Sequence, residues 1–325
     1  MHDRENALKE WLTQTIKQED FVLVPLAGDA SFRRYFRIRY NGLTQIVIDA
    51  PPEKENIGAF LTIANILNQA KIPVPKIIAI NEKYGFLLLS DLGDQLLLNK
   101  LRNDTADNYY HHAIDLLLQI QQCPTADPNL PPFDKAFMLK EMNLCLEWFF
   151  NAYLSLELNQ KEVLLFQESI AWVANEVAKQ PLVFIHRDYH SRNLMLVENQ
   201  HSCLATIDFQ DAMEGPLTYD LVSLLKDCYI SWPREKILDW VTYFYKKCPT
   251  ATIYSLPEFI RAFDLCGLQR HLKVLGVFCR LYLRDNKAGY LNDLPLTLKY
   301  VLECTEMYEE LRPFFNFFQQ RVYLP

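Results

Sequence analysis

The stretch from residue 182 to residue 211 constrains the fold of this chain more than any other feature of the sequence. Short apolar runs at 182–185, 194–197 and 204–207 are separated by polar turns. Each run has the length of a strand and is too short for a helix. The flanking sequence instead repeats apolar residues at intervals of three and four, as amphipathic helices do. We therefore predict a small β insert between helices at 108–121, 137–156 and 161–179 on one side and further helices on the other.

Polar residues follow two of these short runs at the points where the strands should end. Asp188 and Asn193 come after the first run, and Asp208 closes the last. A carboxylate can orient an attacking hydroxyl and accept its proton, while Asn and Asp oxygens can hold Mg²⁺ against nucleotide phosphates. Each residue alone would be an ordinary turn residue, because Asp and Asn favour loops. The three together at strand ends predict a phosphoryl-transfer site.

The N-terminal part of the chain mixes strand and helix patterns. Apolar residues at helical spacing occupy 5–17 and 57–70, and a turn signal lies at 90–93. Strand-like runs surround the second of these helices. They lie at 21–26, 35–40, 44–50, 76–80 and 86–89. We predict a small α+β lobe here, and from residue 94 onward a larger, mainly helical lobe that contains the β insert.

Composition limits the class of protein and its partners. The net charge of −7 disfavours a nucleic-acid partner, since phosphate backbones bind clustered Lys and Arg. The eight cysteines are dispersed, with no CxxC pair, so we expect reduced thiols rather than zinc sites or disulfides. The polar start is unlike a signal peptide, and no apolar stretch has the roughly 18 residues that a membrane span needs. We expect a cytoplasmic monomer that binds no membrane.

The motif HxDxxxxN at 186–193, with Asp208 after the next hairpin, resembles the kinase-like phosphotransferases, the superfamily of aminoglycoside and choline kinases. The resemblance covers nearly the whole chain. It implies a bilobal protein-kinase-like fold of class α+β. Residues 1–92 would form the nucleotide-binding lobe and 93–325 the catalytic and substrate-binding lobe.

Further sequence blocks resemble one branch of that superfamily, the bacterial anomeric kinases of N-acetylmuramate and N-acetylglucosamine. The motif around Asp188 is specific only to the superfamily, whereas these blocks together indicate the branch. They are GDASFRRYFR at 28–37, IDAPP at 48–52, LLLSDLG at 87–93, IDFQDA at 207–212, GPLTYDL at 215–221 and YLNDLP at 290–295.

The resemblance implies roles for residues near the motif. Asp188 would be the catalytic base, and Asn193 and Asp208 would bind the Mg²⁺ of an ATP complex. His190 would stabilise charge on the transferred phosphoryl group. Asp220 would hydrogen-bond the catalytic loop, although an acidic residue in the first turn of a helix is an equally good interpretation.

The resemblance also implies that a turn and a hinge bind the nucleotide. Backbone groups of Gly28 and Ser31 would cover the phosphates. Residues 89–92, including Leu89, Asp91 and Leu92, would meet the adenine. The family places a Lys on the third strand, but 44–50 contains none. One of Arg33, Arg34 and Arg37 would then supply the positive charge.

Four cations late in the chain bear on the acceptor. Arg270, Lys273, Arg280 and Arg284 fall within about an 80° arc of one helix. They form either a surface stripe or a wall that binds an anion, such as the lactyl carboxylate of N-acetylmuramate. The favoured hypothesis is phosphorylation of an amino sugar at its anomeric hydroxyl for cell-wall recycling. The alternatives are a kinase for another small metabolite or antibiotic, and a nucleotide-binding pseudokinase that acts as a regulator.

Overall fold

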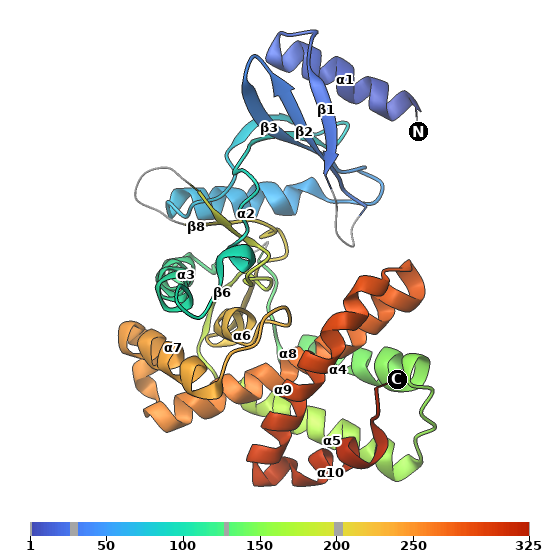
Figure 1. Ribbon diagram of the computed structural model, residues 1–325, viewed down its shortest axis with the longest axis vertical. Coiled ribbons are helices and arrows are strands. Elements are labelled where there is room, and N and C mark those ends of the chain that lie inside the picture. The colour runs from blue at the N-terminus through green and yellow to red at the C-terminus, as the bar shows by residue number, and fades with distance from the viewer. Residues whose placement is uncertain (1, 27–31, 127–129, 198–203, 325) are drawn as a thin grey trace. The chain divides into compact units, whose positions relative to one another are not determined.

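The computed structural model describes residues 2–26, 32–126, 130–197 and 204–324 (Figure 1). The chain divides into two compact units, of which the first contains 1–95 and 195–210 and the second 96–194 and 211–325. The prediction placed one boundary after residue 92. The structure instead groups the hairpin that carries Asp208 with the first unit, although it follows nearly a hundred residues of the second.

The first unit is built on a five-stranded antiparallel sheet of order β1-β2-β3-β5-β4. Every strand and both helices predicted for this part are present, with ends shifted by a few residues at most. The elements are α1 (His2–Ile16), β1 (Val22–Leu26), β2 (Arg34–Tyr40), β3 (Leu43–Asp49), α2 (Ile57–Gln69), β4 (Ile77–Asn81) and β5 (Phe86–Ser90). Two short paired strands complete the unit, β7 (Leu194–Leu196), which crosses the boundary, and β8 (Leu204–Thr206).

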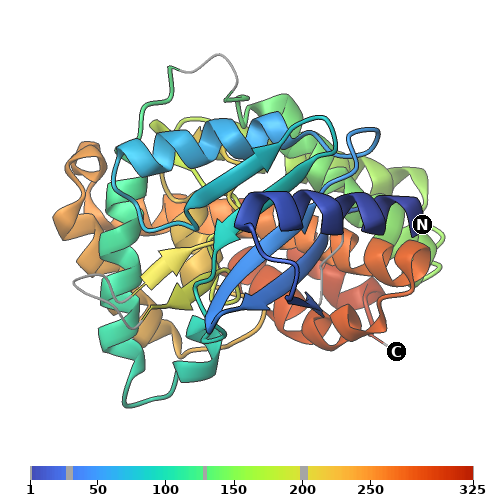
Figure 2. The ribbon, with the colours of Figure 1, turned by 90° about the horizontal axis from the view of Figure 1, so that it is seen from above.

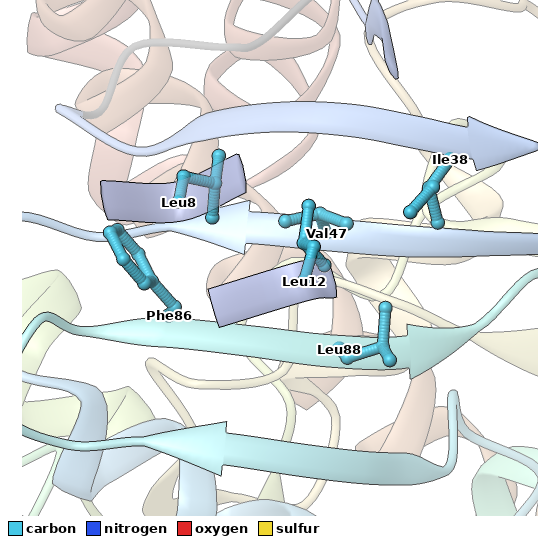
Figure 3. Close-up of a cluster of buried hydrophobic side chains, with 6 residues drawn as sticks. All are labelled: Leu8, Leu12, Ile38, Val47, Phe86 and Leu88. Atoms are coloured by element: carbon cyan, nitrogen blue, oxygen red, sulfur yellow. The ribbon is translucent and has the colours of Figure 1, made fainter. Parts of the chain in front are cut away.

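The core of this unit lies between α1 and one face of the sheet. Leu8 and Leu12, one helical turn apart, point from α1 onto that face (Figure 3). They meet fully buried side chains from β2, β3 and β5, namely Ile38, Val47, Phe86 and Leu88. Figure 2 looks onto α1 as it crosses the strands. Because full burial of one such side chain stabilises by about 1.5–3 kcal/mol, this cluster fixes α1 to the sheet.

The helix α2 holds the segment that follows β8. Its first turn is capped by Asn56, whose side chain accepts the Gly58 N–H at 2.8 Å. Further along, the Phe60 ring packs against Phe209 with 5.0 Å between centroids. In addition, the Thr206 N–H donates to the carbonyl of Pro73 at 2.9 Å. These contacts fix the backbone on both sides of Asp208 within the first unit.

The second unit is mainly helical, so each unit has the predicted secondary-structure class. Its helices are α3 (Ala106–Ile120), α4 (Lys135–Leu144), α5 (Gln160–Val177), α6 (Tyr219–Leu225), α7 (Arg234–Lys247), α8 (Leu256–Asp285), α9 (Leu294–Met307) and α10 (Arg312–Arg321). Short 3₁₀ segments are η1 (Leu97–Lys100), η3 (Pro249–Ile253), η4 (Ala288–Asp293) and η5 (Glu309–Leu311). In the described part of the chain, no helix combines the length and the apolarity needed to cross a membrane.

A two-stranded antiparallel pair, β6 (Leu182–Ile185) and β9 (Met213–Pro216), interrupts these helices. The strand β6 was predicted. The strand β9 was not, because its sequence Met-Glu-Gly-Pro carries two residues that are typical of turns. Its register places Gly215 opposite Val183.

One predicted helix is divided. The apolar pattern at 137–156 predicts a single helix, but α4 ends at Leu144 and continues as the π-helix η2 (Cys145–Tyr153). The long, largely buried helix α8 packs at this junction through Gly276. A Cβ atom at Gly276 would lie 2.2 Å from the Leu144 carbonyl carbon and 2.6 Å from the Cys145 nitrogen. Only glycine therefore permits this approach of the two backbones.

Candidate active site

The loop after β6 gathers the residues predicted from the HxDxxxxN motif into one tight turn. The His190 N–H donates to the Asp188 carbonyl at 3.0 Å, and the Asn193 N–H donates to the His190 carbonyl at 2.9 Å. The Asn193 side-chain amide also donates to the Asp188 carbonyl, at 3.0 Å. Arg187 enters this turn at φ 74°, in the left-handed region that non-glycine residues rarely adopt. The turn therefore places Asp188, His190 and Asn193 side by side.

The loop is anchored at its start by two buried groups. The carboxylate of Asp220, at the beginning of α6, accepts the His186 N–H at 2.6 Å and the Arg187 N–H at 3.0 Å. The hydroxyl of the buried Tyr189 donates to the Ala113 carbonyl of α3 at 2.8 Å. Burial raises the pKa of Asp220 to about 7, and the two backbone N–H groups act in the opposite direction. The hydrogen bonds between Asp220 and the loop are those that the sequence resemblance implied.

Asp188 carries an ionised carboxylate in a partly buried position. Burial would raise its pKa, but the positive charges of Lys273, Arg187 and Arg270 and the neighbouring His190 imidazole outweigh burial and lower it to about 2. The charged form therefore persists at neutral pH. Such a group can orient a hydroxyl and take its proton late in the reaction, which suits phosphoryl transfer, where little base catalysis is needed.

His190 lies beside that carboxylate in a largely neutral form. Burial lowers the pKa of its imidazole, and the nearby carboxylates of Asp227 and Asp188 only partly offset this. Its Nδ1 atom is buried and lacks a hydrogen-bond partner among the described residues. The ring meets Tyr229 edge-on, with 5.3 Å between centroids. A neutral imidazole in this place can exchange hydrogen bonds with a bound group.

Two of the four cations predicted on α8 act on Asp188. Arg270 is only 6% exposed, and among the described side chains no carboxylate lies within ion-pair distance of it. Lys273 is paired with Glu141 at 3.2 Å, and Glu141 also accepts from Arg187 at 2.8 Å. Because an interior cation is costly unless it interacts with a charge, the carboxylates of Asp188 and Asp227, which act on Arg270 beyond ion-pair distance, help to stabilise it.

The other two cations lie further along α8. At 1.5 Å per residue, Arg280 and Arg284 are about 15 Å and about 21 Å beyond Arg270. Arg284 is exposed and pairs with Asp285 at 2.8 Å, while burial and Arg284 lower the pKa of Arg280. The shared arc on the helical wheel does not account for this axial distance. The structure therefore brings Arg270 and Lys273 to the loop but not Arg280 or Arg284.

The first unit holds Asp208 in its own polar cluster. Asp208 adopts φ 63°, and its Oδ1 accepts from the Gln210 side chain at 2.8 Å. Tyr35, on β2, is mostly buried, and this burial raises its pKa, while charges on Arg33, Asp208 and Glu55 also act on it. Arg33 and Glu55 thus lie in the same part of this unit as Asp208.

The three candidate arginines of the first unit differ in their partners. Arg33 pairs with Glu55 through Nε at 3.0 Å, and both side chains are about one-eighth exposed. Arg34 donates to the fully buried Asp49 at 2.9 Å, a carboxylate that also accepts from Arg4 at 2.7 Å. Arg34 is bound within the sheet by Asp49, whereas Arg33, like Asp208, acts on the charge of Tyr35.

Arg37 and the predicted hinge form a separate network. Arg37 pairs with Asp91 and with Asp94, each at 2.7 Å, and Asp91 accepts the Gly93 N–H at 2.9 Å. Leu89 is a buried residue of β5, in register with Ile46 and Ile77, and the half-buried Leu92 follows it. The side chain of Asp91 therefore braces the hinge. Gly28 and Ser31 lie outside the described residues.

Comparison with known proteins decides the family. The model of the phosphotransferase enzyme family matches residues 22–245. The chain belongs to this family. The phosphotransferase is 40% identical over 282 residues to an N-acetylmuramate/N-acetylglucosamine kinase of Pseudomonas aeruginosa, covering 86% of this chain and 82% of that one. It is 36% identical over 320 residues to the kinase of the same name from Neisseria meningitidis, covering 96% and 94%.

Solved structures confirm the predicted protein-kinase-like fold of this phosphotransferase. A choline/ethanolamine kinase family protein from Mesorhizobium loti aligns with a TM-score of 0.65 at 12% identity, covering 96% of this chain and 97% of that one. An ethanolamine kinase of Plasmodium vivax aligns with a TM-score of 0.63 at 12% identity, covering 90% and 84%. At such low identity the likeness concerns the fold alone.

The sequence interpretation missed several charged residues of the second unit. Glu141 and Asp227 are almost fully buried, and both contact loop residues of the motif. The available signal was an acidic residue next to apolar runs, which Asp227 shows at the end of α6. That pattern is common in surface helices as well, so the contacts could be found only from the tertiary structure.

Proposed function

We propose that this phosphotransferase transfers the γ-phosphoryl group of ATP to the anomeric hydroxyl of N-acetylmuramate or N-acetylglucosamine, and so forms a sugar 1-phosphate. The observation that carries the proposal is the likeness, over most of its length, to kinases named for these two sugars. The loop geometry supports it, because the ionised Asp188 lies on a fixed turn beside the neutral His190.

In this proposal Asp188 orients the anomeric hydroxyl and accepts its proton. His190 donates a hydrogen bond to the oxygen on which charge develops. Both groups are held before the substrate binds, because the loop backbone is anchored on buried partners. Prior placement of reacting groups is a large part of catalysis in phosphoryl transfer.

The nucleotide side would use Asp208, Asn193 and Arg33. Mg²⁺ prefers oxygen ligands and is commonly bound by one or two protein oxygens together with substrate phosphates. A carboxylate from Asp208 and an amide oxygen from Asn193 fit that preference. Within the described ranges, no three His, Cys, Asp or Glu side chains gather into a metal site of their own. The metal would neutralise phosphate charge, and Arg33, oriented by Glu55, would add a guanidinium for a phosphate oxygen.

The acceptor side would use Arg270. N-acetylmuramate differs from N-acetylglucosamine by a lactyl group that ends in a carboxylate. A buried guanidinium that forms no ion pair with a carboxylate of the described residues is suited to bind that anion. Lys273 would contribute mainly through its charge, because it is already paired with Glu141.

The test combines the two sugars with two matched variants. MgATP with either sugar should give a new ³¹P resonance of a sugar 1-phosphate. Arg270→Met should lower the ratio of kcat/KM for N-acetylmuramate over N-acetylglucosamine by about 10-fold, the effect of losing one charged hydrogen bond. Arg284→Met, on the same helix but exposed, should leave that ratio unchanged. Absence of turnover with both sugars would sink the acceptor proposal, and an unchanged ratio in Arg270→Met would remove Arg270 from it.

A cytoplasmic location is part of the proposal. Seven cysteines in the described part of the chain are free and buried, as expected for a protein in a reducing compartment. The monomeric state stays a prediction, which sedimentation of the purified protein would check.

A further inference from the structure

A second buried carboxylate, Asp227, forms hydrogen bonds with the loop at Ser191, three residues after Asp188. Asp227 is 1% exposed and Ser191 is fully buried. The Ser191 N–H donates to Asp227 Oδ2 at 3.0 Å, and the Ser191 hydroxyl donates to the same oxygen. The Ser191 carbonyl in turn accepts the Leu98 N–H of η1 at 3.1 Å. Every polar group of Ser191 is therefore held, and the residue lies directly between His190 and Arg192.

The other oxygen of Asp227 holds the aromatic residue that packs on both neighbours of Ser191. Asp227 Oδ1 accepts the Tyr229 N–H at 3.0 Å. The Tyr229 ring contacts His190 edge-on, and the Arg192 guanidinium lies 3.5 Å from the centroid of the same ring. One carboxylate thus ties the backbone of the loop to the surface against which His190 rests.

The two carboxylates that bind the loop, Asp220 and Asp227, lie at the two ends of one helix. Asp220 stands in the first turn of α6 (Tyr219–Leu225), and Asp227 follows its end by two residues. Asp220 binds the N–H groups before Asp188, and Asp227 binds the N–H and hydroxyl groups after His190. Because α6 is buried at every position, its two ends are fixed relative to each other. The loop segment between the residues bound by Asp220 and by Asp227 then has little freedom to move.

We propose that Asp227 is a positioning residue for phosphoryl transfer, which acts through Ser191 and Tyr229 to hold His190 and Asn193 at the distances that the reaction needs. This inference rests on the proposed function, because it gives His190 and Asn193 their catalytic tasks. A buried hydrogen bond to a carboxylate is stronger than a neutral one, so this contact is suited to resist displacement of the loop. A shift of about 1 Å in a catalytic group can lower a rate by about 100-fold.

The experiment separates positioning from folding by deleting each half of this contact. Ser191→Ala removes the hydroxyl and keeps the N–H donor, and Asp227→Asn keeps the shape and removes the charge. Each should lower kcat by about 10-fold while the KM values for MgATP and for the sugar change by less than about twofold. The double variant should be no slower than Asp227→Asn alone, because the two residues act through one contact. Ser169→Ala, which removes a hydroxyl bonded only within α5, is the matched control and should retain the wild-type kcat.

Hydrogen exchange of the peptide that spans 186–193 gives a readout that needs no substrate. Both variants should exchange faster there than the wild type, and Ser169→Ala should not. A wild-type kcat in both variants, or a lowered Tm with an unchanged kcat per folded molecule, would overturn the proposal. If the wild type turned over neither sugar, the proposed function would fail. Unchanged hydrogen exchange in both variants would then overturn the positioning role of Asp227 independently of the proposed function.

Discussion

The loop around Asp188 and the cluster around Asp208 hold their charged residues in different ways. In the second unit, the loop backbone is bound by the buried carboxylates of Asp220 and Asp227, and Arg270 nearby is also buried. In the first unit, Arg33 and Glu55 form a side-chain pair that remains partly exposed. The difference is that the loop is held through its backbone, whereas the cluster around Asp208 is held through side chains.

The same contrast has an energetic side. Breaking a buried charge contact leaves a group without its partner and commonly costs about 3–5 kcal/mol, whereas a partly exposed ion pair contributes about 1 kcal/mol or less. Substitutions of the buried carboxylates that bind the loop should therefore affect catalysis and stability together. Substitution of Arg33 should affect ligand binding with little effect on stability.

The largest effect is expected at Asp188, on the loop of the second unit. Asp188→Asn keeps the size of the side chain but removes the charge that accepts the proton in the proposed reaction. It should lower kcat by about 10² to 10⁴, the range for loss of a general base, with an intact fold and normal nucleotide binding. Steady-state kinetics together with circular dichroism would measure this. A kcat within threefold of wild type would show that Asp188 has another role.

A smaller and different effect is expected at Arg33. Arg33→Ala should raise the KM for ATP by about 10-fold through loss of a charged hydrogen bond, with a Tm close to that of the wild type. Arg34→Ala is the matched comparison, because it leaves the fully buried Asp49 with Arg4 as its remaining cation. This second variant should lower the Tm and leave the KM unchanged. The reverse pattern would assign the phosphate contact to Arg34.

A third effect concerns stability toward acid, to which the buried His271 should contribute. His271, on α8, donates to the Lys226 carbonyl at 3.0 Å and is 1% exposed. Burial lowers its pKa from 6.5 to about 3, against the effect of that hydrogen bond. Between these values the unfolded chain binds the additional proton, so the contribution to stability is complete above about pH 6.5 and is lost as the pH falls toward about 3.

Urea unfolding of His271→Gln would measure this contribution. From about pH 7.5 to about pH 5, His271 should account for about 2 kcal/mol of the stability that the wild type loses, since its shift spans about 1.5 pH units of that interval at about 1.4 kcal/mol each. The variant should therefore lose about 2 kcal/mol less than the wild type over the same range. An equal loss in both proteins would show that His271 is protonated in the folded state.

The sequence predicted most of the elements and the position of the loop, because apolar periodicity and polar strand ends are local properties. It did not predict β9, since Gly215 and Pro216 favour turns and their pairing with β6 depends on partners distant in the sequence. It also placed Arg280 and Arg284 with Arg270, because a helical wheel shows the angle around an axis and omits the distance along it. The contacts of Asp227 and Glu141 could not be predicted for a similar reason, since burial of an acid is decided by neighbouring elements.

The contact at Gly276 sets the position of α8 along its own axis. Glycine lets the backbone of α8 touch the backbone at Leu144 and Cys145, where α4 changes into a π-helix. Because no side chain lies between the two backbones, they approach this closely only at Gly276. This contact therefore fixes the position of α8 along its axis. Lys273 and Arg270 lie three and six residues before Gly276, which is about 4.5 Å and about 9 Å along the helix. The positions of these two cations relative to Asp188 therefore depend on how closely the two main chains approach each other at Gly276.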